Sequence, residues 1–356
     1  MKKTPKKIKK YIENNVYEES LKRINHIFDV FDTIVVLFSG GKDSLATLHL
    51  VKEVAFSKGI YTVNVVFRDE EFISSSIINF VNEYRIKDWI DMKYFCVPTW
   101  STKYVLGSTK NVIQWDKQRK HVREIPKHAI QHDKIFNKHQ MDAYISGFYK
   151  GKIAFVNGIR ATESLVRFAS CMNKVNENYI NKTECNKNSV RLCKPIFDWE
   201  ENDVFKYFFD NNIKYCPVYD MQMWNNENLR VASPIHQEAS KRFYKLRTLD
   251  PTLYQQIVDI FPEMILQDKY YREFDLNALY RKYDKDMHGV LSYIKEYISD
   301  KKQKHLAYRM FKKAVVANNN DPTAYPVEHV LKQFISGAYK RGIYPVSKNI
   351  YEQRTN

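Results

Sequence analysis

Residues 33–51 read TIVVLFSGGKDSLATLHLV, and this stretch decides the fold. Thr33–Phe38 is a β-branched run that is apolar on both faces, which is typical of a strand buried in a parallel sheet. Gly40 and Gly41 follow at once, in a chain with only ten glycines, and Leu45–Val51 has helical character. The stretch therefore predicts a strand, a tight loop and a helix in that order.

The same alternation continues along the chain. Strand-like runs recur at residues 61–67, 92–97, 153–157 and 191–197, with helical segments that include 73–84 and 200–211. Strands alternating with helices indicate a parallel sheet covered on both faces. We therefore predict an α/β fold: a doubly wound, mainly parallel five-stranded sheet in a Rossmann-like α/β/α sandwich. Residues 98–150 form a long insertion, and insertions of this length tend to be functional.

A length of 356 residues suits about two domains. We expect an N-terminal helical segment at 1–28, an α/β domain at 29–225 and a basic helical C-terminal region at 226–356. Helical patterns in the last region cover residues 235–248, 251–260, 275–283, 290–298, 305–318 and 327–339. The run Lys301, Lys302, Lys304, Arg309, Lys312 and Lys313 predicts a solvated helix face, with nucleic-acid contact as the alternative.

The amino-acid composition limits which classes of protein this chain can belong to. Apolar residues make up 44% and charged residues 28%, an ordinary globular balance, and no apolar run is long enough for a transmembrane helix. The basic N-terminus has no apolar core behind it, so we do not expect a secretory signal. Five scattered cysteines without a C-x-x-C motif favour a reducing cytoplasm, and we expect no iron–sulfur cluster. The net charge of +16 suggests a polyanionic partner, or a composition rich in solvated lysines.

The loop at 39–44, Ser-Gly-Gly-Lys-Asp-Ser, predicts an anion site. Glycines let a ligand approach the main chain, and the first amides of the following helix have no internal partner. Ser39 and Ser44 add hydroxyl donors and Lys42 adds charge, while Asp43 caps amides or helps to hold Mg²⁺. The alternative is a turn that merely tolerates glycine. The spacing differs from that of the common G-x-x-x-x-G-K-[ST] loop.

This motif resembles the PP-loop of the N-type ATP pyrophosphatases, which include the small subunit of ATP sulfurylase and the phosphoadenosine phosphosulfate (PAPS) reductases. Further blocks support the PAPS reductase-like family, and in particular its branch that carries the name PAPS sulfotransferase. These blocks are Gly158–Ser164 with Arg167, Lys194–Trp199, Asp203-Val204, Asn211-Asn212, Pro217–Asp220, Trp115-Asp116 with Arg119, Arg123 and Pro126, and Leu229–Pro234. The resemblance implies that residues 29–225 form a nucleotide-binding domain.

The expected site residues fall into three groups. Those expected to bind nucleotide are Ser39, Gly40, Gly41, Lys42, Asp43, Ser44, Asp69, Glu71, Gly158, Arg160, Glu163 and Arg167. We expect Lys42, Asp43 and Arg160 to act in catalysis. For Arg160 the reason is its place after a strand, because a ligand of a doubly wound sheet lies beyond the carboxyl ends of the strands and an arginine there would face the phosphates. Trp115, Arg119 and Arg123 are candidates for clamping a substrate. The alternatives are a surface ion pair with Glu163 for Arg160 and Arg167, helix caps for Asp69 and Glu71, and a wet loop around Trp115.

The resemblance implies an enzyme that uses ATP or PAPS, with Mg²⁺. No cysteine follows Cys216, so the thiol of the reductases is missing, and we expect adenylyl transfer with pyrophosphate release or sulfuryl transfer. The alternative is a non-catalytic, nucleotide-dependent module that binds DNA, RNA or a protein, with a ParB-like or nuclease-like partner implied by the resemblance. His236 is an acid–base candidate, although a lone histidine is more often structural.

Overall fold

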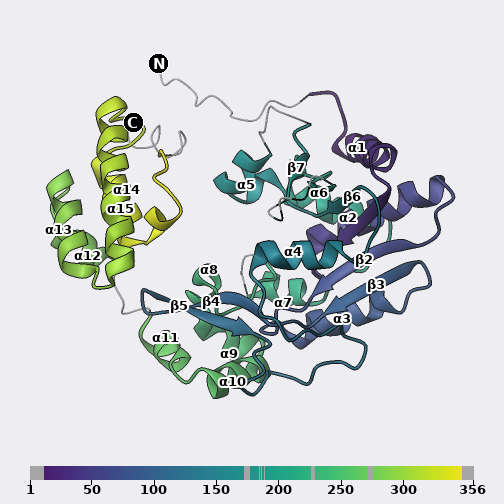
Figure 1. Ribbon diagram of the computed structural model, residues 1–356, viewed down its shortest axis with the longest axis horizontal. Coiled ribbons are helices and arrows are strands. Elements are labelled where there is room, and N and C mark those ends of the chain that lie inside the picture. The colour runs from purple at the N-terminus through teal and green to yellow at the C-terminus, as the bar shows by residue number, and fades with distance from the viewer. Residues whose placement is uncertain are drawn as a thin grey trace. The chain divides into compact units, whose positions relative to one another are not determined.

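The structure is a computed structural model that describes residues 12–171, 177–183, 185, 187, 189–225, 229–271 and 276–346. It contains two compact units, and the larger one spans Glu13–Lys269. Among the described residues, the second unit comprises Ile12 and the residues from Tyr270 onward. The larger unit carries the predicted α/β fold (Figure 1). Part of the predicted segment at 1–28 lies outside the described residues, and its described helix, α1 (Val16–Val30), packs on this unit.

The central sheet has six strands in the order β3-β2-β1-β6-β8-β7. Their bounds are β1 Thr33–Leu37, β2 Val63–Arg68, β3 Ile90–Phe95, β6 Ile153–Val156, β7 Ile180–Lys182 and β8 Val190–Cys193. The five predicted strands are present, and all five run parallel. The sixth, β7, pairs antiparallel with β8 at the edge of the sheet. Its three residues are too few to show a periodic pattern, so the predicted number of five is corrected to six.

Helices cover both faces of the sheet, as predicted. On one face pack α1, α2 (Lys42–Ser57), α3 (Ser75–Arg85) and α6 (Glu201–Asp210). On the other face Val35 and Phe155 pack against α4 (Lys138–Ser146). Neighbouring residues of β1 alternate between the two cores: Ile34 and Val36 face α2, whereas Val35 faces α4. Strand β1 is therefore buried on both faces, which explains its continuous apolar run.

The insertion at 98–150 contains a β-hairpin that the sequence did not indicate. Strands β4 (Thr99–Val105) and β5 (Ser108–Gln114) pair antiparallel around Leu106 and Gly107, which both have positive φ angles. The hairpin shares a hydrophobic cluster with α10 (Pro251–Ile260) and Met264, the first residue of α11 (Met264–Tyr270). Because this cluster joins residues 235–264 to the larger unit, the predicted boundary at 225/226 moves to 269/270.

The second unit is helical and has its own core. Its helices are α12 (Leu276–Lys282), α13 (Met287–Tyr297), α14 (Lys301–Asn320) and α15 (Val327–Ile335). Val290, Ile294, Leu331 and Phe334 are fully buried in that core. Among the described helices of the whole chain, none is long and apolar enough to cross a membrane.

Candidate functional site

The loop between β1 and α2 is a tight turn that needs its glycines. Gly40 has a φ of +74°, and a Cβ there would lie 2.9 Å from two side chains of α3. Ser44 Oγ accepts a hydrogen bond from the Ser39 amide at 3.1 Å and donates one to the Gly41 carbonyl at 2.9 Å. The amides of Gly40 and Asp43 have no acceptor among the described residues. The turn therefore holds donors ready for an anion.

Two loops meet where the strand order reverses. The chain winds from β1 to β2 and β3 in one direction, and β6 and β8 lie on the other side of β1. Ligands of doubly wound sheets bind beyond the carboxyl ends of the strands at this point. A Cβ at Gly158, which follows β6, would lie 2.4 Å from the carbonyl carbon of Asp43 and 2.7 Å from the amide nitrogen of Ser44. Glycine at 158 thus allows the second loop to approach the first turn of α2.

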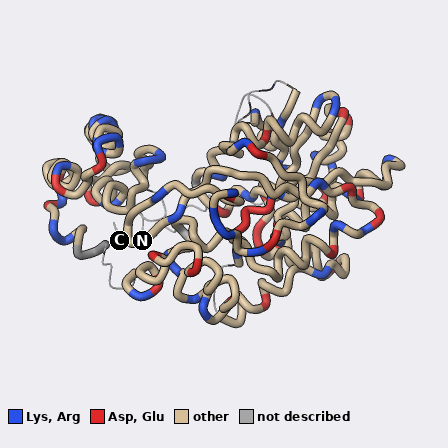
Figure 2. Tube along the Cα trace, turned by 60° about the horizontal axis from the view of Figure 1, so that its bottom comes forward, with Lys and Arg blue, Asp and Glu red and all other residues tan. Residues whose placement is uncertain are grey.

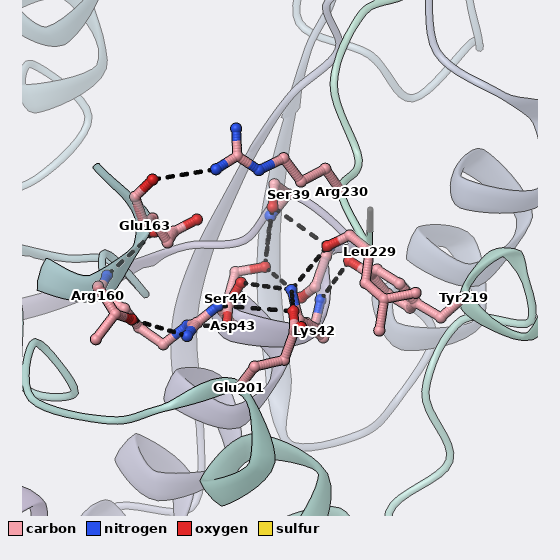
Figure 3. A network of polar contacts seen from close by, with 12 residues as sticks. Ser39, Lys42, Asp43, Ser44, Arg160, Glu163, Glu201, Tyr219, Leu229 and Arg230 are labelled. Atoms are coloured by element: carbon pink, nitrogen blue, oxygen red, sulfur yellow. Dashed lines mark hydrogen bonds and ion pairs between the residues drawn. The ribbon is translucent and has the colours of Figure 1, made fainter. Parts of the chain in front are cut away.

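A compact cluster of charges lies at this junction (Figure 3). The Lys42 side chain is only 3% exposed, and its Nζ lies 3.2 Å from Asp43 Oδ2 and 3.1 Å from Glu201 Oε1. It also donates to the Leu229 carbonyl at 2.8 Å. Arg160 Nε donates to Asp43 Oδ1 at 2.6 Å. Two cations and two carboxylates therefore hold one another in place beneath the loop.

Residues of two further segments, 217–225 and 229–232, also contact the loops. The Tyr219 hydroxyl accepts a hydrogen bond from the backbone amide of Lys42, with 2.8 Å between the nitrogen and the oxygen. Burial raises the pKa of Tyr219, so this hydroxyl stays protonated. Arg230 Nη2 donates to the Glu163 carbonyl at 3.2 Å. Tyr219, Glu201 and Arg230 were not among the predicted site residues. The available signal was that Tyr219 and Arg230 stand within the late blocks that resemble the family.

The loops enclose a cavity of about 410 Å³. Its lining residues come from the loop, the end of β2, the turn after β6 and the late segment: Leu37, Phe38, Ser39, Gly41, Lys42, Asp43, Ser44, Val66, Arg68, Glu70, Asn157, Gly158, Ile159, Glu163, Arg167, Tyr219, Leu229, Arg230, Val231 and Ala232. Burial, followed by repulsion from Arg230, lowers the pKa of the Arg167 guanidinium, which forms an ion pair with Glu163. Such crowding of like charges favours an anionic ligand.

The predicted loop residues come together in this cavity, with two exceptions. Gly40 shapes the turn without lining the cavity, and Arg160 lies behind Asp43. Both carboxylate oxygens of Asp43 already accept from cations, Arg160 and Lys42. Mg²⁺ bound to Asp43 would therefore have to compete with these two cations, and a magnesium ligand at Asp43 stays a prediction from the sequence. Among the described residues, no group of three or more His, Cys, Asp or Glu side chains could hold a metal ion.

The other predicted residues form a separate network. Asp69 pairs with Arg123, and Glu71, which is fully buried, pairs with Arg119. Glu71 also accepts the amide hydrogen of Trp115 at 2.6 Å. Of these five, none lines the loop cavity, so their contacts favour a role in fastening the insertion to the end of β2 over direct contact with nucleotide.

Two curated proteins have sequences that are similar to part of this chain. The uncharacterized protein YbdN of Escherichia coli (strain K12) is 25% identical over 256 residues, which is 67% of this chain and 63% of YbdN. Sulfate adenylyltransferase subunit 2 of Shewanella amazonensis is 24% identical over 217 residues, 56% of this chain and 65% of that protein. The matched region thus spans less than two thirds of the length of each relative.

Among solved structures, FMN adenylyltransferase from Candida glabrata aligns with a TM-score of 0.39 and 15% identity, over 59% of this chain and 62% of that one. PAPS reductase from Candida auris aligns with a TM-score of 0.34 and 10% identity, over 57% and 84%. At the level of families, residues 33–282 match the phosphoadenosine phosphosulfate reductase domain, and this match contains the whole six-stranded sheet. The chain therefore belongs to the phosphoadenosine phosphosulfate reductase domain family.

Proposed function

We propose that this protein is a transferase that binds ATP or PAPS with its phosphates on residues 39–44. The observation that carries the proposal is the cavity at the β1/β6 junction, which Lys42, Arg167 and Arg230 line. A polyanion there would compete with Asp43 and Glu201 for the cations that these carboxylates now hold. Membership of the family supports an adenine nucleotide as that polyanion.

The proposed reaction needs no protein nucleophile. An acceptor attacks the α-phosphorus of ATP, the bond from that phosphorus to the bridging oxygen breaks, and pyrophosphate leaves with the electron pair. Lys42, once released from Asp43, stabilises the charge that develops on the leaving group, and Arg160, which does not line the cavity, adds positive charge from behind Asp43. With PAPS the same cations would stabilise adenosine 3′,5′-bisphosphate as the sulfuryl group departs.

The cysteines support transfer over thiol-driven reduction. Cys96, Cys171, Cys193 and Cys216 are buried, and no cysteine lines the loop cavity. Cys216 is the cysteine nearest in sequence to Tyr219, and burial raises the pKa of its thiol to about 11. Because the thiolate is the reactive form, such a thiol is a poor nucleophile at neutral pH.

The test measures pyrophosphate and AMP released from ATP, and sulfate released from PAPS, by the wild type, Lys42→Ala and Ser39→Ala. We expect Lys42→Ala to lower the rate about 100-fold, as when one stabilising donor is removed from a transition state. Lys52→Ala, on the same helix but outside the loop cavity, is the matched control. Equal rates in the wild type and Lys42→Ala, with intact folding by circular dichroism, would contradict the proposal.

A second candidate function is nucleic-acid binding by α14. This helix of twenty residues has six Lys and Arg side chains and no Asp or Glu. Lys301, Lys302, Arg309, Lys312 and Lys313 are exposed, and none of them forms an ion pair with a described acidic residue. Unpaired cations along one helix are the electrostatic pattern that contacts phosphate backbones.

A further inference from the structure

A second cavity of about 260 Å³ adjoins the loop cavity, because Arg68 and Glu70 line both. These two residues stand at the carboxyl end of β2, beside the strand that carries the loop. Asp69, which lies between them in the sequence, also lines the second cavity. The remaining lining residues come from β3 and the segment after it, the hairpin, α4 and the turn before α8 (Gln237–Ser240): Phe95, Val97, Thr99, Trp100, Ser101, Gln114, Met141 and His236. The insertion therefore supplies a wall next to the proposed nucleotide.

The second cavity combines an apolar side with a hydrogen-bonding pair. Phe95 and Met141 are buried, and Trp100 is 51% exposed although it lines the cavity. Ser101 Oγ and His236 Nε2 lie 2.8 Å apart. They bring together two segments that are 135 positions apart in the sequence. A ligand with a ring could thus pack on Trp100 while its polar group reaches the pair.

The charges of this cavity are unlike those of the loop cavity. Its cation, Arg68, is paired with Asp142 at 3.0 Å. Asp69 is paired with Arg123, and the exposed carboxylate of Glu70 has no cationic partner among the described residues. No further Lys or Arg lines the cavity. An inorganic anion such as sulfate would therefore find no free positive charge here, whereas an amine or a hydroxyl would find acceptors.

We propose that the second cavity is the acceptor subsite, and that it takes an uncharged or cationic organic molecule with a ring and an amino or hydroxyl group. This inference rests on the proposed function. On transfer, a new bond joins the acceptor's nitrogen or oxygen to the α-phosphorus as pyrophosphate leaves with the electrons of the broken bond. The attacking group is the hydroxyl or the uncharged amine, so an acceptor that binds as an ammonium ion first releases one proton to water. The proton displaced when the new bond forms passes to the Ser101–His236 pair.

The test uses benzylamine and benzyl alcohol as probes, with benzoate and inorganic sulfate as anionic comparisons. Binding to the full chain is followed by saturation-transfer NMR, and ATP binding is followed separately by calorimetry. We expect the first two probes to bind and the anions not to bind. Trp100→Ala and His236→Phe should each weaken benzylamine binding by roughly tenfold, about 1.4 kcal/mol. Trp224→Ala, an 85% exposed tryptophan outside both cavities, is the matched control.

The experiment distinguishes a failure of the acceptor subsite from a failure of the proposed nucleotide site. If ATP binds but benzylamine does not, or if benzylamine binding is the same in Trp100→Ala and Trp224→Ala, the acceptor subsite is overturned while the nucleotide site stands. If sulfate binds more tightly than benzylamine and His236→Phe weakens it, the assignment of a non-anionic acceptor is overturned. If ATP does not bind to the wild type, the proposed function fails even where benzylamine binds.

Discussion

At the scale of single residues, the lack of a side chain at Gly158 has a measurable consequence. In Gly158→Ala the new Cβ would lie 2.4 Å from main-chain atoms of Asp43, so the backbone at the start of α2 must shift. We expect ATP affinity, measured by calorimetry, to fall at least about tenfold, because the shift would disturb the amides that we propose bind the phosphates.

Gly147→Ala is the control for this change. Gly147 has a φ of −66°, and a Cβ there would meet its nearest atom, the Tyr144 carbonyl oxygen, at 3.2 Å. We expect this variant to bind ATP like the wild type. If Gly158→Ala also binds ATP with wild-type affinity, the close approach of the two loops does not control the site.

Sequence alone predicted the site residues that lie next to strand ends. Ser39–Ser44 and Gly158 directly follow strands, so a local pattern is enough to place them. Tyr219 was missed because its contact with Lys42 joins residues 177 positions apart. Asp69 and Glu71 also follow a strand, yet they pair with Arg123 and Arg119 in the part of the insertion after the hairpin, because the carboxyl end of each strand meets different neighbours.

At the scale of elements, the hairpin shows where prediction from the sequence stopped. The insertion was recognised by its length, but β4 and β5 were missed because only some of their side chains are buried and many are polar. The turn between them is the pair Leu106-Gly107, which has positive φ angles but is not the Asn-Gly or Asp-Gly pair that marks a two-residue hairpin turn in a sequence. By contrast, the parallel strands were predicted because burial on both faces selects continuous apolar runs.

The buried ion pair of Glu71 should contribute to the stability of the larger unit. Glu71→Gln leaves the Arg119 guanidinium, whose side chain is 19% exposed, without its carboxylate. Removing one partner of a buried pair costs roughly 3 kcal/mol. We expect a loss of that size in the free energy of unfolding, measured by urea titration.

Substitution of the neighbouring residue, Glu70, is the matched control for the loss in the free energy of unfolding. Glu70→Gln changes an exposed carboxylate that has no ion pair with a described residue, so we expect a change within about 0.5 kcal/mol. Equal effects of the two substitutions would show that the buried pair does not fasten the insertion.

At the scale of the whole molecule, the chain divides by packing and not by composition. Lys and Arg are spread along both units, so the net charge of +16 does not mark one region (Figure 2). Helical patterns begin near residue 235, and this is why the sequence placed the boundary at 226. Residues 235–264 nevertheless pack on Phe72 and the hairpin, a tertiary contact that no local pattern indicates.

The basic helix of the second unit should determine any binding to nucleic acid. We expect the full chain to bind duplex DNA with an affinity that falls steeply as salt rises, measured by fluorescence anisotropy. Replacing Lys302, Arg309 and Lys312 with Gln should make the slope of log affinity against log salt shallower by up to about 0.9 for each lost phosphate contact. The three side chains are exposed and recur at helical spacing along α14.

The control must remove the same charge elsewhere, because any loss of three cations weakens nonspecific attraction. Lys22, Lys117 and Lys206 are mostly exposed, and each is already paired with an acidic side chain. Replacing these three with Gln should leave the salt slope nearly unchanged, because paired lysines release few counterions on binding. If the two triple variants lose affinity equally, α14 is a solvated helix face and the nucleic-acid function is excluded for it. If only the α14 variant loses affinity, this helix contacts the phosphate backbone.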